Sequence, residues 1–117
     1  MKKSGDKGEI IAIEYLKKNG FEIIDTNFKF SRFGEIDIVG KKEDLTIFFE
    51  VKYRSNNFFG IGEESITKSK LFKLSKTINY YVLTHKLDFE KIRFDIITIL
   101  KEEKSYKLTH YRNQSLV

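Results

Sequence analysis

The sequence contains no cysteine, no proline and no tryptophan, and only two histidines among its 117 residues. Without cysteine, neither a disulfide framework nor a thiolate zinc site can form, and the two histidines are too far apart in the chain to make a histidine-rich metal motif. Any metal must therefore be bound by oxygen ligands. No apolar run approaches membrane-spanning length, and the basic first residues lead into a stretch interrupted by Glu9 and Glu14. We therefore expect neither a signal peptide nor a membrane span, and a cytoplasmic protein.

Length and composition predict one folded domain over residues 1–117. Apolar residues make up 40% of the chain, with eleven phenylalanines and six tyrosines, which is enough for one aromatic-rich core. The formal net charge of +5 favours a polyanionic partner, and nucleic acid above an acidic small molecule. Charge alone is a weak filter, because many basic proteins bind no nucleic acid.

The hydrophobic periodicity predicts the order helix, three strands, helix, two strands. Apolar residues at helical spacing predict helices over residues 5–19 and 65–84. Stretches rich in β-branched and aromatic residues predict strands over residues 21–30, 35–39, 45–53, 93–100 and 106–111. The short polar connection between the second and third strands suits an antiparallel hairpin.

This hairpin carries a set of charged residues. If residues 41–44 form the loop, Asp37 lies opposite Phe48 and diagonal to Glu50, while Glu35 lies opposite Glu50. Alternation of side chains then predicts one charged face, made of Glu35, Asp37, Glu50 and Lys52. The same alternation places Ile36 and Ile38 together on the opposite, apolar face. A slip by one residue would bury the charges in the core.

Carboxylates gathered on one face of a sheet need a compensating cation, which could be Lys52 or a divalent metal. Asp37 and Glu50 offer the oxygen ligands that Mg²⁺ takes from proteins. Glu9 lies at the edge of the apolar stripe of the first helix and can join them, although an acid in a first turn is also favoured by the helix dipole. A Glu-x-Lys tripeptide alone often marks only a solvated strand face.

The segments Gly34-Glu35-Ile36-Asp37-Ile38 and Phe49-Glu50-Val51-Lys52-Tyr53-Arg54 resemble the signature of the YraN-like uncharacterised protein family. The resemblance runs nearly end to end, with further matches at Gly8-Glu9, Ala12, Tyr15-Leu16, Asn19-Gly20-Phe21, Asn27-Phe28, Ser65-Ile66, Lys70 and Arg93-Phe94-Asp95. That family is similar in turn to restriction-endonuclease-like enzymes of the PD-(D/E)XK superfamily and to archaeal Holliday junction resolvases. One departure is Ile36, which stands where the superfamily's name-giving motif has proline.

The resemblance implies an α/β fold with a restriction-endonuclease-like αβββαβ core, whose mixed central sheet is flanked by helices. It also implies an endonuclease that hydrolyses phosphodiester bonds with Mg²⁺ or Mn²⁺, with a structured DNA such as a junction or flap in repair or recombination as the expected substrate. The implied catalytic residues are Glu9, Asp37, Glu50 and Lys52. Of these, Asp37, Glu50 and Glu9 are the expected metal ligands, and Glu35 either supports the site or faces solvent.

Basic side chains are the candidates for contact with nucleic acid, namely Arg54, Lys68, Lys70 and Lys73, although a charged helix face is often only solvated. Phe58 and Phe59 could stack on an unpaired base, pack in a dimer or fold back onto the core. One alternative function is a catalytically inactive nucleic-acid-binding adaptor that keeps the nuclease fold. Another is a structural or protein-interaction domain with no response to divalent metals. A homodimer would suit a domain this small acting on two strands, but no self-complementary patch is evident in the sequence.

Overall fold

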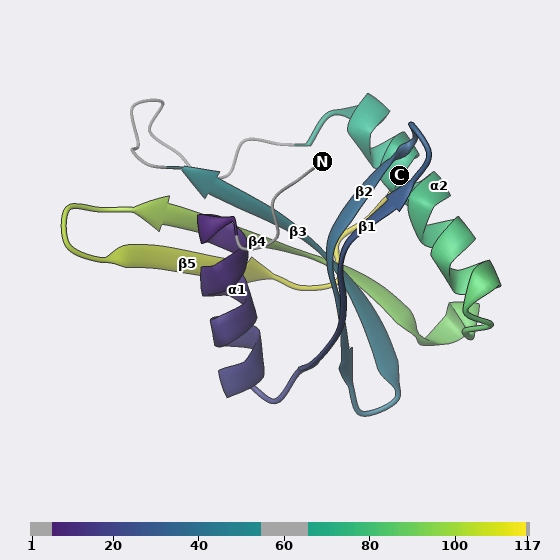
Figure 1. Cartoon of the computed structure of the whole chain (residues 1–117), viewed down its shortest axis with the longest axis horizontal. Helices are drawn as coiled ribbons and strands as arrows, with labels where there is room; N and C mark the ends of the chain where they lie inside the picture. The colour runs from purple at the N-terminus through teal and green to yellow at the C-terminus, as the bar shows by residue number, and fades with distance from the viewer. Residues whose placement is uncertain (1–5, 55–65, 117) are drawn as a thin grey trace.

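The computed structural model describes residues 6–54 and 66–116, and in these ranges the chain forms a five-stranded sheet and two long helices (Figure 1). The elements are α1 (Lys7–Lys18), β1 (Glu22–Phe30), β2 (Gly34–Lys42), β3 (Leu45–Arg54), α2 (Lys68–Thr84), the short 3-10 helix η1 (Phe89–Lys91), β4 (Ile92–Lys101) and β5 (Tyr106–Tyr111). The predicted order of helices and strands is confirmed.

The strands lie side by side in their order along the chain, from β1 to β5. Neighbouring strands are antiparallel except β3 and β4, which are parallel. Parallel neighbours need a long crossover, and here the connection contains α2. The sheet is therefore mixed and follows the expected αβββαβ order, with β5 added at the edge next to β4.

The two helices cover opposite faces of the sheet, as the alternation of side chains on β3 shows. Ile47 and Phe49 pack with α1, whereas Phe48 between them packs with α2. The cluster under α1 consists of Ala12, Leu16, Phe21, Ile38, Ile47, Phe49, Ile97 and Ile99. The cluster under α2 consists of Ile36, Val39, Phe48, Leu74, Ile78, Tyr81, Val82 and Phe94. Each fully buried large side chain in these clusters contributes about 1.5–3 kcal/mol to folding.

Close contact between α1 and β3 depends on Gly8. A Cβ atom at this position would lie 2.8 Å from the Cβ of Tyr53, which is shorter than any ordinary carbon contact. Glycine therefore allows the first turn of α1, which carries Glu9, to approach the strand. No helix within the described ranges has the length and apolar character needed to cross a membrane.

The predicted register of the β2–β3 hairpin is wrong by two residues. The observed pairs include Lys42 with Leu45 and Val39 with Phe48, because the turn is a tight one at Glu43-Asp44, where Glu43 has a φ of 58°. A shift of two leaves each side chain on its predicted face but changes its neighbour. Continuing the register beyond the pair of Ile38 and Phe49 makes Asp37 and Glu50 the next residues along, opposite each other rather than diagonal.

The expectation that Ile36 and Ile38 share a face is also wrong. Ile36 packs under α2, whereas Ile38 packs under α1. The change of side occurs at Asp37 and coincides with Asn27 of β1, which lies between the partners of the two isoleucines and has a φ of 53°. This left-handed conformation is uncommon for a residue other than glycine, although asparagine tolerates it. The β1–β2 hairpin is thus bent at the level of the acidic residues.

Candidate active site

Three carboxylates from α1 and β2 converge beside β3. Glu9, Glu35 and Asp37 can each present one carboxylate oxygen such that the three oxygens lie within 4.8 Å of one another. Glu9 and Asp37 are buried, and Glu35 is half-buried. Negative charges at such distances repel one another, so the group favours a bound cation. Carboxylate oxygens are the ligands preferred by Mg²⁺ and Mn²⁺, and the donor set fits either ion.

Asn27 connects two of these acids. Its Nδ2 donates to both carboxylate oxygens of Glu9, at 3.1 and 3.0 Å, and to Oε2 of Glu35 at 3.0 Å. These bonds orient the two acids and offset part of their repulsion. In the sequence Asn27 is singled out only as a position of family resemblance, not as a site residue. The available signal was an asparagine inside a predicted strand, where that residue is disfavoured.

Asp37 is bonded directly to the strand that carries Glu50 and Lys52. The backbone N–H of Val51 donates to Oδ2 of Asp37 at 2.8 Å. The carboxylate therefore takes the place of a backbone acceptor at the end of the β2–β3 ladder. Asp37 and the tripeptide Glu50-Val51-Lys52 lie together, as expected from the alternation of side chains.

Glu50 is buried and points to α2, where its Oε2 lies 2.8 Å from Nζ of Lys70. Burial raises the pKa of Glu50, and the negative charge of Asp37 raises it further, while Lys70 and Lys52 oppose both effects. Glu50 is not part of the acidic group of Glu9, Glu35 and Asp37. The structure therefore places Glu35, expected in a supporting role, inside the acidic group, whereas Glu50, expected as a metal ligand, lies outside that group and pairs with Lys70.

Lys52 follows Glu50 on the same side of β3 and is half-buried. Burial lowers the pKa of Lys52, the nearby Lys70 and Arg54 lower it further, and the carboxylate of Glu50 has the opposite effect. Lysine is a compact point charge with three donors, and its proton affinity changes readily on burial. Lys52 is thus a cation whose charge is sensitive to what binds beside it.

The four basic residues expected to contact nucleic acid lie at the end of β3 and on the first turns of α2. Arg54 is half-buried at the end of β3, and Lys68, Lys70 and Lys73 are exposed on the first turns of α2. A pocket of about 210 Å³ lies between α2 and the β1–β2 turn. Its lining residues are Phe33, Gly34, Glu35, Thr67, Ser69, Lys70, Lys73 and Leu74. Glu35 and Lys70 link this pocket to the acidic site. Phe58 and Phe59 lie outside the described residues.

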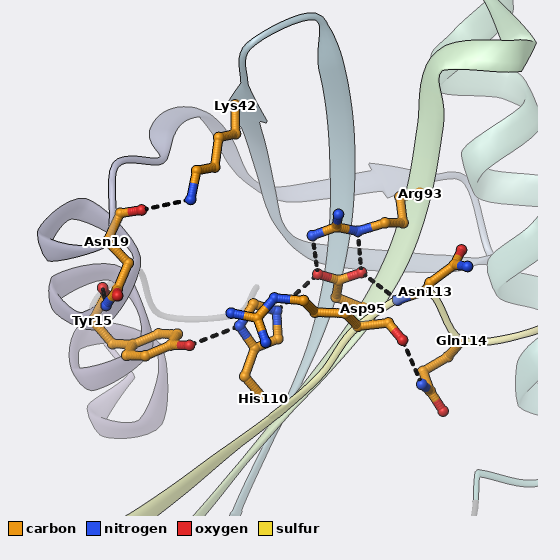
Figure 2. A network of polar contacts seen from close by, with 9 residues as sticks. Tyr15, Asn19, Lys42, Arg93, Asp95, His110, Asn113 and Gln114 are labelled. Atoms are coloured by element: carbon orange, nitrogen blue, oxygen red, sulfur yellow. Dashed lines mark hydrogen bonds and ion pairs between the residues drawn. The ribbon is translucent and has the colours of Figure 1, made fainter.

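A second buried polar network, which the sequence analysis did not predict, is centred on Asp95 of β4 (Figure 2). Its carboxylate accepts from Nε and Nη2 of Arg93, both at 2.9 Å, and from the N–H of Asn113 at 2.9 Å. Nε2 of His110 lies 2.8 Å from the carboxylate, and Nδ1 of the same ring lies 2.8 Å from the hydroxyl of Tyr15.

Burial alone would raise the pKa of Asp95, but the hydrogen bonds from His110, Arg93 and Asn113 outweigh burial and lower it. The carboxylate is therefore held in its charged form in the interior. Through His110 and Tyr15 the network joins β4 and β5 to α1, the helix that carries Glu9 (Figure 2).

The mixed sheet, the helices on its two faces and the acids on its β2–β3 hairpin define an α/β domain with a restriction-endonuclease-like core. The chain belongs to the uncharacterised protein family UPF0102, whose model matches residues 8–99. It is 40% identical over 109 residues to a UPF0102 protein of Flavobacterium psychrophilum, covering 93% of this chain and 90% of that protein. It is 44% identical over 99 residues to a UPF0102 protein of Clostridium tetani, covering 85% of this chain and 80% of that protein. UPF0102 is the YraN-like family, so the resemblance read from the sequence is confirmed.

Proposed function

We propose that this protein is a metal-dependent nuclease that hydrolyses phosphodiester bonds in nucleic acid, with structured DNA in the cytoplasm as its substrate. The observation that carries the proposal is the convergence of Glu9, Glu35 and Asp37, whose ligand oxygens come within 4.8 Å of one another beside Glu50 and Lys52. Three gathered carboxylates disfavour binding of a phosphate unless a cation accompanies it. The chain's net charge of +5 supports a polyanionic substrate.

Glu9, Glu35 and Asp37 would hold Mg²⁺ or Mn²⁺. Such an ion, when bound, neutralises charge on a phosphate and lowers the pKa of a water ligand. Asn27 and the N–H of Val51 hold the carboxylates in place before the substrate arrives. Preorganised ligands of this kind cost no rearrangement during the reaction.

Lys52 is the side chain that stabilises the negative charge formed on the phosphate during the reaction. In hydrolysis a water oxygen forms a bond to phosphorus, one P–O ester bond breaks, the water loses a proton and the departing oxygen gains one. Negative charge grows on the phosphoryl oxygens during this step, and the ammonium group of Lys52 donates hydrogen bonds to them. Glu50 and Lys70 flank this position, and Lys68, Lys73 and Arg54 contact neighbouring phosphates.

The test is a cleavage assay on duplex, flapped, forked and four-way DNA with Mg²⁺ or Mn²⁺, using Asp37→Asn and Lys52→Ala. Removing one preorganised electrostatic contact typically slows an enzyme by about 10²–10³-fold, and we expect a loss of that order for each variant. Matched controls are Asp44→Asn, at a side chain that is 70% exposed, and exposed Lys107→Ala. Both controls should cleave like the wild type.

Metal binding provides a second readout that does not depend on cleavage. Mn²⁺ should raise the melting temperature of the wild type and of Asp44→Asn, but not that of Asp37→Asn, because ligands that bind only the folded state stabilise it. Cleavage that survives both Asp37→Asn and Lys52→Ala would overturn the assignment of the site. A wild type that binds DNA and Mn²⁺ but never cleaves would instead favour the adaptor function.

A further inference from the structure

Aromatic rings from β1, the β1–β2 turn and α2 form a continuous stack at the surface. The ring of Phe30 lies parallel to that of Tyr80, with centroids 4.0 Å apart and an interplanar angle of 6°. Phe33 stacks on Phe30 with a centroid distance of 5.1 Å and an angle of 26°. Although Phe33 and Tyr80 are stacked, 38% and 40% of their surfaces remain exposed. Phe30 is thus the middle ring, and Phe33 is at one end of the stack.

Phe33 is also a wall of the pocket of about 210 Å³ that contains Glu35, Lys70 and Lys73. The next residue, Gly34, packs against α2, since a Cβ atom there would lie 3.7 Å from Cβ of Lys73. The wall of one pocket therefore combines an aromatic ring of the stack, two lysines and Glu35 of the acidic group.

We propose that the Phe33–Phe30–Tyr80 stack is a platform for an unpaired base of nucleic acid, and that Lys73 and Lys70 contact the phosphates next to that base. Aromatic rings beside cationic side chains are the arrangement by which proteins bind single strands, because every base offers a flat π-face. The platform rests on the proposed nuclease function. It deepens that function by naming the substrate class, which is DNA with a single-stranded segment beside the cleaved bond.

The charges around the stack favour a nucleotide over an apolar protein surface. Arg32, Lys73 and Lys76 are exposed on the turn and on α2 near the rings. An apolar partner would leave these cations to be desolvated, whereas a nucleic acid pairs them with phosphates while its base covers the ring of Phe33.

The test measures binding without cleavage, in EDTA, of a duplex and of the same duplex bearing a short single-stranded flap. The flap carries 2-aminopurine at the junction, whose fluorescence is quenched when the base stacks. Phe33→Leu keeps an apolar side chain but removes the ring. From the energy of base–aromatic stacking, it should weaken flap binding by about tenfold and restore the fluorescence, while duplex affinity is unchanged.

The matched control is Phe89→Leu. Phe89 lies on η1, which follows the C-terminal end of α2, whereas the pocket lies at the N-terminal end of α2, and 49% of the Phe89 surface is exposed. It should bind and quench like the wild type. Lys73→Gln should weaken binding and reduce its salt dependence by the equivalent of about one phosphate contact. Circular dichroism melts establish that each variant is folded.

Unchanged flap affinity in Phe33→Leu, or no quenching in the wild type, would overturn the platform. The two proposals fail separately. A wild type that stacks 2-aminopurine but does not cleave would refute the nuclease and leave the platform standing. A wild type that requires Asp37 for cleavage but binds flap and duplex equally would refute only the platform.

Discussion

Replacing Asp95 with asparagine should remove much of the stability of the folded protein. The carboxylate is fully buried, and its hydrogen bonds to Arg93, His110 and Asn113 are 2.8–2.9 Å long. In Asp95→Asn, one of the two acceptor oxygens becomes an NH₂ group. That group faces N–H donors, and the guanidinium of Arg93 loses the negative charge beside it.

The size of the loss follows from the number of donors left without an acceptor. Hydrogen bonds to a charged group contribute about 1.5–3 kcal/mol each, and breaking a buried ion pair from one side costs about 3–5 kcal/mol. The bonds of one carboxylate are not additive, so we expect the unfolding free energy to fall by about 3–5 kcal/mol. This is a large part of the stability of an ordinary small domain.

Urea unfolding followed by far-UV circular dichroism measures this change. With a slope of about 1–3 kcal/mol per molar urea, the midpoint should fall by roughly 2 M in Asp95→Asn. Asp44→Asn makes the same chemical change at a carboxylate that is 70% exposed and should shift the free energy by no more than about 0.5 kcal/mol. A loss below about 1 kcal/mol in Asp95→Asn would refute the reasoning.

The pH dependence gives an independent check. The pKa of Asp95 is lower in the folded state than in the unfolded chain, so its contribution is complete above the unfolded value of about 4. The contribution is lost as pH falls through the folded pKa. The gap between wild type and Asp95→Asn should therefore persist from neutral pH to about 5 and should narrow only in stronger acid. A gap that closes between pH 7 and 5 would point to another group.

Three further predictions concern the site and its supports. Gly8→Ala places a methyl group 2.8 Å from Cβ of Tyr53 and should lower the unfolding free energy by about 1–3 kcal/mol, measured by urea unfolding; an unchanged midpoint would contradict it. Burial and Asp37 raise the pKa of Glu50, so without divalent metal the wild type should lose stability relative to Glu50→Gln as pH rises from about 4. With the metal present, nuclease activity should be lower in Glu50→Gln than in the wild type. Urea midpoints at pH 4 and 7 test the stability prediction, and a wild type that becomes more stable relative to Glu50→Gln between pH 4 and 7 would argue against it. Thr67→Ala removes the N-cap of α2 and should cost about 1 kcal/mol, whereas Thr67→Ser should cost little; equal melting temperatures for the two variants would disprove the cap.

Much of the fold could be predicted because helix and strand periods are local properties of the sequence. The register of the β2–β3 hairpin could not be predicted, since Glu43 adopts a left-handed conformation in the turn and the turn contains no Asn-Gly or Asp-Gly pair that would indicate it. Glu50 and Lys52 keep their predicted side because a shift of two residues preserves the side of each side chain, whereas in β2 the side changes at Asp37. The opposite placements of Ile36 and Ile38 depend on the bend at Asn27, which alternation alone does not contain.

The site was predictable only as far as alternation and resemblance extend. They placed Asp37 near Glu50 and added Glu9, but the contacts of Asn27 with the acids depend on how α1 packs against β1. The network at Asp95 was missed for a related reason. Its partner His110 lies on β5, and their contact requires the register between two strands that the periodicity of either strand does not specify.

The parallel pairing of β3 with β4 also bears on how the chain folds. Thr46 pairs with Ile92, whereas β1, β2 and β3 are joined by short turns. Closing a long loop costs entropy before any pairing is gained, and each doubling of its length adds about 0.6 kcal/mol. The β1–β2–β3 meander and the β4–β5 hairpin thus close at a small entropic cost, and we expect docking of α2 and β4 onto β3 to be the slower step. Substitutions in the meander should chiefly change the folding rate, whereas those at the β3–β4 contact should chiefly change the unfolding rate.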